Sequence, residues 1–416
     1  MPTPGESGLR FEISARAALR TTFDDARVEL ELDDRTLLDT LACVAHARNE
    51  PMLRRQAELW RLPQGFVLNA NRHGVRPGDA AFVNAAGAHA QDFDDTQLST
   101  TAHVSGVVWG ALLAVAPPDT TGSELARASA AGRRFVKMMS SFVVPGHLRA
   151  GWHATGTVSA LAAVVAIGSL TSDERTTWRG LGIAGSLVGG LRANNVTALK
   201  PLHAGRAAEN AVCAMEIARS NAWSGSASLT ALGEAMEFAD AAELVADIPD
   251  DSDVLAKRYP SCSGTHPAVE LALSARDAVR SDSPVKLTVP ALVAEETTTD
   301  WPSNISEARM SLPYLLAVAL ARGAVDTDTI RLGTTDPEVR ALFDRIAIII
   351  DGDDTTSTRY QPWAHLESGN VNRSMQLVAP STADISRKWS AARGDDTTPA
   401  PLRRLRNMAD LWAYLE

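Results

Sequence analysis

The stretch from about Leu37 to Ser220 constrains the fold more than any other part of the chain. It is rich in alanine and carries apolar residues at helical spacing, and clusters of Gly, Pro or Ser divide it into segments of helix length. Such segments bury their apolar faces by packing helix against helix, so we predict a helical bundle. One helix start is explicit, because Thr171-Ser-Asp-Glu174 has the spacing of a capping box.

The sequence changes character after Ser281. Three runs have the pattern of β-strands: 285–289, 347–350 and 374–378. Further helices are expected at 267–279, 306–322 and 337–346. We therefore predict a mainly α protein with a large all-helical domain over residues 1–258 and a smaller α/β lid domain over 259–394. A helix within 395–416 is expected to return to the first domain, after a linker near 394–401.

The charge balance excludes some partners and singles out one residue type. The 416 residues contain 40 Lys and Arg against 50 Asp and Glu, a net charge of −10. This balance argues against a general affinity for nucleic acid or anionic membranes. Only five of the basic residues are lysines, so each lysine is a candidate for a specific role. They are Lys137, Lys200, Lys257, Lys286 and Lys388.

The cysteines and the apolar stretches predict a cytoplasmic protein. Cys43, Cys213 and Cys262 lie too far apart for a CxxC unit and are expected to be small buried hydrophobes in a reducing compartment. The N-terminus shows no basic region followed by an apolar stretch. The longest apolar stretches, 104–117 and 158–170, fall short of the roughly 18 residues that a membrane span needs.

Two motifs do not predict a cofactor. Gly180-Leu-Gly182-Ile-Ala-Gly185 matches GxGxxG but lies inside a helical pattern rather than after a strand, so we interpret its glycines as close helix packing. Cys262 and His266 are four residues apart without further ligands at metal spacing. We therefore expect neither a bound nucleotide nor a metal.

Four of the nine histidines stand directly before or at the start of an apolar, helix-like run: His103, His153, His203 and His266. Pro201 and Pro267 suit first helical turns and support two of these placements. The positive end of a helix dipole disfavours imidazolium and leaves a neutral ring that can act as a base. The free N–H groups there attract carboxylate or phosphate. Several such termini would form an anion-binding, proton-transferring pocket.

An acidic segment precedes His103. Helical spacing would put His89, Asp92 and Thr96 on one face, with Asp95 at its edge. The face could point into a pocket, or the segment could be a solvated acidic helix end. The residues alone leave both readings open.

Five motifs together resemble the MmgE/PrpD family, which includes 2-methylcitrate dehydratase, cis-aconitate decarboxylase and iminodisuccinate epimerase. They occur in the family's order over roughly residues 35–325. The motifs are His89-Ala-Gln-Asp-Phe-Asp-Asp-Thr96 with His103; Gly151-Trp-His-Ala-Thr-Gly156; Lys200-Pro-Leu-His-Ala-Gly-Arg-Ala-Ala208; Lys257-Arg-Tyr-Pro-Ser-Cys262 with Thr265-His-Pro267; and Glu307-Ala-Arg-Met-Ser-Leu-Pro-Tyr314.

The resemblance implies a homodimeric, cofactor-independent lyase that acts on a small di- or tricarboxylic acid by α-proton abstraction and elimination. A decarboxylase, an epimerase or a non-catalytic family member are the alternatives. The implied catalytic residues are Asp92, His103, His153, Lys200, His266 and Tyr314. Residues implied to bind substrate are Thr96, His203, Arg206 and Lys257. In this scheme His103 or His153 is the base, Lys200 stabilises the developing charge, and His266 or Tyr314 protonates the leaving hydroxyl.

Three positions depart from the family pattern. Gln97 replaces a histidine, Val104 replaces the proline of a His-Pro-Ser motif, and Trp152-His-Ala-Thr155 replaces Phe-His-Pro-Thr. The ionisable positions are kept. We therefore expect an altered pocket wall, which would affect the choice of substrate more than the type of reaction.

Overall fold

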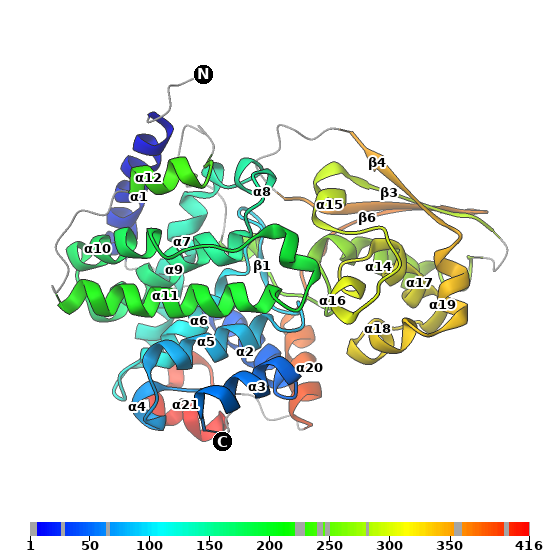
Figure 1. Ribbon diagram of the computed structural model, residues 1–416. Helices are drawn as coiled ribbons and strands as arrows, with labels where there is room; N and C mark the ends of the chain where they lie inside the picture. The colour runs from blue at the N-terminus through cyan, green and yellow to red at the C-terminus, as the bar shows by residue number, and fades with distance from the viewer. Residues whose placement is uncertain are drawn as a thin grey trace.

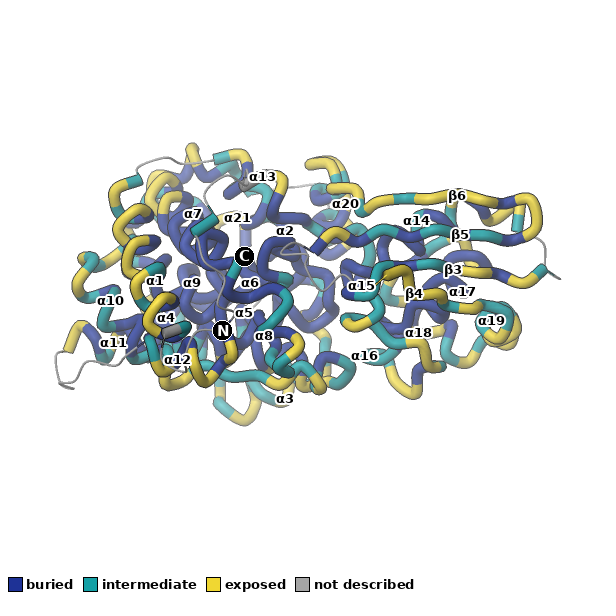
Figure 2. The backbone as a smooth tube through the Cα atoms, turned by 90° about the horizontal axis from the view of Figure 1, so that it is seen from above, coloured by how far each residue is buried: buried dark blue, intermediate teal, exposed yellow. Residues whose placement is uncertain are grey.

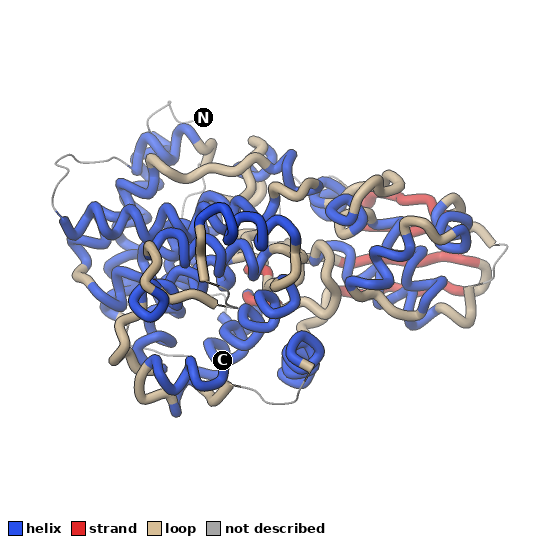
Figure 3. Tube along the Cα trace, turned by 60° about the horizontal axis from the view of Figure 1, so that its bottom comes forward, coloured by secondary structure: helices blue, strands red, loops and turns tan. Residues whose placement is uncertain are grey.

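The chain folds into two lobes joined side by side, a large helical one and a smaller one built on a sheet (Figure 1). A computed structural model describes residues 6–25, 30–63, 67–220, 229–238, 244–245, 250–279, 283–352, 360–394 and 399–415. Figure 3 shows that the longer strands gather in the smaller lobe. The predicted class, mainly α with a smaller α/β part, is confirmed.

The helical lobe is arranged around two almost fully buried helices, α6 (Val104–Val115) and α9 (Ala154–Thr171), seen as dark tube in Figure 2. The helices around them are α1 (Glu6–Asp24), α2 (Leu30–Ala47), α3 (Pro51–Trp60), α4 (Ala70–His73), α5 (Pro77–His89), α7 (Gly122–Met138), α8 (Gly146–Arg149), α10 (Glu174–Gly185), α11 (Lys200–Ser220), α12 (Leu229–Ala235) and α13 (Asp250–Asp253). Short 3-10 turns lie at η1 (Ser140–Phe142) and η2 (Arg192–Val196).

Helix α9 corrects one expectation. Its apolar run was expected to be too short for a membrane span, but the helix has 18 residues and is long and apolar enough by length and composition alone. The protein buries 83% of it, as expected for the central helix of a folded core. It is the one such helix among the described residues.

Helix α10 begins two residues later than the capping-box pattern suggests. Thr171 is the last residue of α9, and its hydroxyl donates to the Ile167 carbonyl (2.7 Å). Asp173 is the N-cap instead and accepts from the Thr176 N–H. The interpretation of the glycine motif is confirmed, because a Cβ on Gly180 would lie 2.5 Å from the sulfur of Met215 in α11.

The smaller lobe contains a four-stranded sheet of order β4-β3-β5-β6, with β3 parallel to β4 and the other pairs antiparallel. Its strands are β3 (Val285–Pro290), β4 (Ile346–Asp351), β5 (Trp363–Ser368) and β6 (Val371–Gln376). Its helices are η3 (Ser263–Thr265), α14 (His266–Ala275), α15 (Ala291–Glu296), α16 (Ile305–Ala308), α17 (Leu312–Arg322), α18 (Thr327–Gly333) and α19 (Pro337–Phe343). Alternate residues of β3 and β5 are buried, so the sheet presents one apolar face to α14 and α17.

Most elements predicted for this lobe are present. The expected strands at 285–289 and 347–350 are confirmed, while the third lies slightly earlier, as β6, and β5 was missed. The helix expected over 306–322 is broken between α16 and α17, because the Thr298 carbonyl and N–H pair with Leu312 and Met310 across this break. Part of the acidic turn after β4, including Asp353 and Asp354, lies outside the described residues.

The C-terminal segment returns to the helical lobe. Helix α20 (Thr382–Arg393) falls within the range predicted for the lid, yet it packs against α2. The helix expected over 402–415 is split into a 3-10 turn, η4 (Leu402–Arg404), and α21 (Met408–Leu415). Backbone hydrogen bonds join Leu405 to Gly122 (2.9 Å) and Met408 to Pro118 (3.1 Å). Most of the predicted linker, residues 395–398, lies outside the described residues.

Candidate active site

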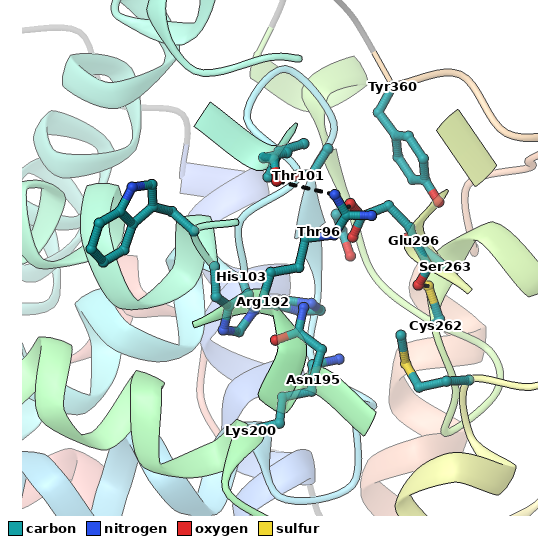
Figure 4. A pocket seen from close by; sticks show the side chains of 14 residues that line it. Thr96, Thr101, His103, Arg192, Asn195, Lys200, Cys262, Ser263, Glu296 and Tyr360 are labelled. Carbon is teal, nitrogen blue, oxygen red and sulfur yellow. Dashed lines mark hydrogen bonds and ion pairs between the residues drawn. The ribbon is translucent and has the colours of Figure 1, made fainter. Parts of the chain in front are cut away.

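A pocket opens between the two lobes and is lined by polar side chains from both (Figure 4). The helical lobe contributes His103, His153 and Lys200, each at the start of a helix. The second lobe contributes Cys262 and Tyr360 from the opposite wall. The site therefore depends on the packing of one lobe against the other.

The acidic segment that precedes His103 is a loop and not a helical face. Helix α5 ends at His89, and Asp92 has a positive φ of 51°. Aspartate tolerates this left-handed conformation better than most residues, and it reverses the chain at this point. Thr96 begins a two-residue strand, β1 (Thr96–Gln97), which pairs with β2 (Val254–Leu255). These strands are an exception to the expected all-helical first domain.

Asp92 lies between two lysines. Its Oδ2 is 2.8 Å from Lys200 Nζ, and its Oδ1 is 2.5 Å from Lys257 Nζ. Burial alone would raise the pKa of Asp92, but the two ammonium groups hold it well below the usual value. Burial likewise opposes the charge on Lys200, and Asp92 overcomes this so that the lysine pKa is raised. Lys200 therefore stays cationic inside the protein, and Lys257 shares its carboxylate partner.

A second acid, Asp94, lies beside two imidazoles, those of His89 and His103. His89 Nδ1 lies 3.0 and 2.9 Å from the two Asp94 oxygens, and His103 Nδ1 lies 3.3 Å from Oδ1. Burial would raise the pKa of Asp94, but His103 and His89 lower it well below its usual range. Because Asp94 is acceptor-only when ionised, it favours the His89 tautomer with the proton on Nδ1. The other ring nitrogen of His103, Nε2, lies 3.7 Å from Asp92 Oδ1.

A second histidine pair faces the first. His153 Nδ1 and His203 Nδ1 are 2.8 Å apart. Since only one proton can lie between them, one ring is protonated on Nδ1 and the other on Nε2. When His153 donates this hydrogen bond, its own Nε2 is a free base. The His89 and His153 rings stack with centroids 5.7 Å apart, so the four imidazoles form one cluster.

The histidine positions at helix starts are confirmed. His103 and His153 are the N-caps of α6 and α9, His203 lies in the first turn of α11, and His266 is the first residue of α14. Burial lowers the pKa of His89 and His203 to about 4, and that of His153 well below 6.5. These imidazoles are neutral near pH 7 and can accept a proton.

The free energy of unfolding is expected to fall as the pH drops from about 6.5 to about 4. An unfolded histidine has a pKa of about 6.5, whereas that of buried His89 is about 4. In this pH window His89 therefore binds a proton in the unfolded chain and stays neutral in the folded chain. His89 alone should cost about 3 kcal/mol of stability at pH 4. Urea unfolding at several pH values measures the effect, and a free energy that stays constant from pH 6.5 to 4 would contradict it.

Four residues could in principle hold a metal ion. Donor atoms of His89, Asp92, Asp94 and His103 all lie within 4.8 Å of one another, and all four residues are buried. A divalent cation there would compete with the ammonium groups of Lys200 and Lys257, which already occupy Asp92. The donor set is better explained as a hydrogen-bonded acid and base network.

Three predicted site residues lie elsewhere. Tyr314 is buried in α17, and its hydroxyl donates to the Ile330 carbonyl in α18. Arg206 is half exposed and pairs with Glu209 (2.6 Å). His266 is buried and does not line the pocket; its ring lies 5.2 Å from that of Tyr259, and the charges that act on it are those of Lys257 and Asp92. The remaining predicted residues gather at the pocket or bond to residues that line it: Asp92, Thr96, His103, His153, Lys200, His203 and Lys257.

The pocket residues that were missed in the sequence include Arg192, Glu296 and Tyr360. Arg192 in η2 reaches across the pocket to Glu296, with Nε 3.3 Å from Oε1, and Tyr360 lies beside them (Figure 4). Arginine is abundant in this chain, so Arg192 gave no signal. The other two lie outside the five motifs. His89 and Asp94 stood inside a motif but were not assigned a role.

The departures from the family pattern affect the pocket wall less than expected. Gln97 donates to Asp253 (2.9 Å) and to the Arg133 carbonyl (3.2 Å), away from the pocket, and Val104 is fully buried in α6. Of the substituted positions, only Trp152 lines the pocket.

Comparison with known proteins decides the relationship. The MmgE/PrpD N-terminal domain matches residues 15–240, and the MmgE/PrpD C-terminal domain matches residues 259–373. The chain belongs to the MmgE/PrpD family. It is 27% identical over 297 residues to cis-aconitate decarboxylase from Homo sapiens. The matched region covers 65% of this chain and 61% of that protein. The same enzyme from Mus musculus is 26% identical over 299 residues, 65% of this chain and 60% of the relative. In both cases less than two thirds of the relative is matched.

The two MmgE/PrpD domains correspond to the two lobes. The pocket lies between them, and the residues that face it come from both matched regions. Helix α20 and the segment after it lie beyond residue 373, outside both matches.

Proposed function

We propose that this MmgE/PrpD protein is a cofactor-independent lyase that removes water from a small di- or tricarboxylic acid. The observation that carries the proposal is the convergence of a neutral, buried imidazole, His153, a second buried imidazole, His103, and a buried lysine on one pocket. Neutral imidazole accepts a proton near pH 7, and a fixed cation stabilises the charge that develops when a proton leaves the carbon α to a carboxylate.

The residues divide into roles. Lys200 and Arg192 bind substrate carboxylates, and the Nε2 of His153 or His103 takes the α-proton. The electron pair left on carbon expels the β-hydroxyl, which leaves as water after it accepts a proton. Tyr360 takes the acid role first assigned to Tyr314, because it lines the pocket and its pKa lies well above the usual value through burial, so its hydroxyl stays protonated.

Decarboxylation is the second candidate, and the names of the matched relatives favour it. The same pocket would stabilise the carbanion that remains after a carboxylate leaves as CO2, and a histidine would then protonate it. Both reactions need the same cation, but dehydration needs a base to remove the α-proton, whereas decarboxylation needs an acid to protonate the carbanion. A homodimer and a cytoplasmic location remain expectations from the sequence.

Product analysis tests the proposal. The purified protein is incubated with cis-aconitate, citrate, 2-methylcitrate, malate and aspartate, and products are read by proton NMR. We expect an alkene from a hydroxy acid, and we expect His153→Ala to abolish its formation while His365→Ala, on β5 outside the pocket, does not. CO2 release would establish the decarboxylase instead. Conversion of no acid, or full activity in His153→Ala, would refute the lyase.

A further inference from the structure

Glu296 is a carboxylate in the wall of a pocket that is proposed to bind acids. It ends α15 and lines the pocket beside Arg192, with 13% of its side chain exposed (Figure 4). Its Oε1 is buried and accepts no hydrogen bond, although Arg192 Nε is 3.3 Å away. A buried acceptor without a donor is costly, so a ligand that brings a donor would be stabilised there.

The pKa of Glu296 is consistent with an incompletely compensated charge. Burial raises it, and the nearby cations Arg192 and Lys200 only partly counteract the effect. A further hydrogen-bond donor or positive charge would stabilise the ionised form.

Glu296 also balances the charges of the site. Arg192 and Lys200 are the cationic side chains that line the pocket among the described residues, and each is paired, Arg192 with Glu296 and Lys200 with Asp92. Lys257 shares Asp92, and Asp94 offsets that extra charge. The cluster is thus close to neutral before substrate arrives. Each ligand carboxylate therefore adds negative charge to a buried site, so a trianion is disfavoured more strongly than a dianion.

Building on the proposed function, we propose that the substrate carries no more than two carboxylates and bears a hydroxyl or amino group that donates a hydrogen bond to Glu296. Lys200 and Arg192 each hold one carboxylate. The hydroxyl or amino group of the substrate lies between its two carboxylates and the second lobe, where it donates a hydrogen bond to Glu296. A third carboxylate is disfavoured because it meets Glu296 instead of a cation.

Binding of non-reacting and reacting acids tests this selection by isothermal titration calorimetry. The probes are succinate, malate, aspartate and tricarballylate, which differ in the donor group and in the number of carboxylates. We expect malate or aspartate to bind about tenfold more tightly than succinate, because one hydrogen bond to a charged group is gained. Tricarballylate should bind no more tightly than succinate.

Substitution of Glu296 assigns the preference to this residue. In Glu296→Gln the advantage of aspartate should fall about tenfold, and tricarballylate should bind more tightly than to the native protein because the negative charge that faces its third carboxylate is removed. In Glu296→Ala the advantage of malate should be lost as well. Glu295→Gln is the matched control, since Glu295 is the neighbouring residue and its carboxylate pairs with Arg149 instead. It should bind all four acids as the native protein does.

The outcomes separate the two proposals. Equal affinities for succinate, malate and aspartate, tightest binding of tricarballylate, or binding of none of the four at about 10 mM would overturn the role of Glu296. A preference that survives in Glu296→Ala would overturn it too. Catalysis is judged separately by product formation, so a Glu296-dependent preference without turnover would refute the lyase and keep the binding inference.

Discussion

Replacing Lys200 with methionine is expected to lower kcat/KM by about 10²- to 10³-fold. The side chain is buried at the pocket, and Asp92 keeps it cationic. Methionine preserves much of the volume but removes the charge that binds a substrate carboxylate and stabilises the carbanion. Kinetics with whichever acid of the product screen is converted measures the loss.

The fold should survive this substitution. Lys257 still donates to both Asp92 Oδ1 and the Asp92 carbonyl, so the buried acid keeps a cationic partner. Lys286→Met is the control, because Lys286 is exposed on β3 and should retain full activity. If Lys200→Met kept kcat/KM within about threefold of the native value, Lys200 would not stabilise the reacting charge.

Replacing Lys388 with methionine is expected to lower the free energy of unfolding by about 3–5 kcal/mol. Lys388 lies in α20, is buried, and donates to Asp39 (2.7 Å) in α2 and to the Phe93 carbonyl. Burial would lower its pKa, but Asp39 raises it, so the lysine stays cationic. Burial raises the pKa of Asp39, and Lys388 counteracts this by stabilising the carboxylate. Removing the cation leaves Asp39 uncompensated next to Asp95, whose pKa burial already raises to about 7.

A second substitution separates charge from packing. Asp39→Asn combined with Lys388→Met should recover part of the lost stability, because no uncompensated ion remains. The control Lys286→Met should stay within about 0.5 kcal/mol of the native protein. Urea unfolding gives all four values, and a loss below about 1 kcal/mol in Lys388→Met would show that this pair is not needed to hold α20 on the helical lobe.

The histidine positions were predictable because local rules decide them. A polar residue before an alanine-rich apolar run marks a helix start, and the structure places His103 and His153 at such N-caps. Which of these starts meet in space is a matter of tertiary packing. His266 follows the same local rule, yet its helix does not bring it to the pocket, and neither spacing nor periodicity contains that information.

The acidic loop shows where periodicity fails. Helical spacing grouped His89, Asp92 and Thr96, but the helix ends at His89 and Asp92 adopts a left-handed conformation. The bonds that stabilise this loop come from distant segments, Lys257 to Asp92 and Lys388 to Phe93. The expectation that Tyr314 faces the pocket failed for a related reason, because Tyr314 lies on the apolar helix α17 and points into the core.

The scarcity of lysine was a better guide than it first appeared. Four of the five lysines are buried, and three of them pair with buried aspartates, whereas Lys286 alone of the five is exposed. Two of the buried ones lay inside the motifs. Lys388 lay outside the motifs. Only the scarcity of lysine suggested a role for it, and the sequence could not specify that role.

The most direct test of the account is exchange of the substrate α-proton in D2O. The native protein is incubated with each acid that it binds, and the α-proton signal is followed by NMR. We predict exchange in the native protein, its loss in His153→Ala and Lys200→Met, and its retention in His365→Ala and Lys286→Met. Tight binding of an acid whose α-proton never exchanges, or exchange at the native rate in His153→Ala and Lys200→Met, would contradict the claim that this pocket transfers a proton.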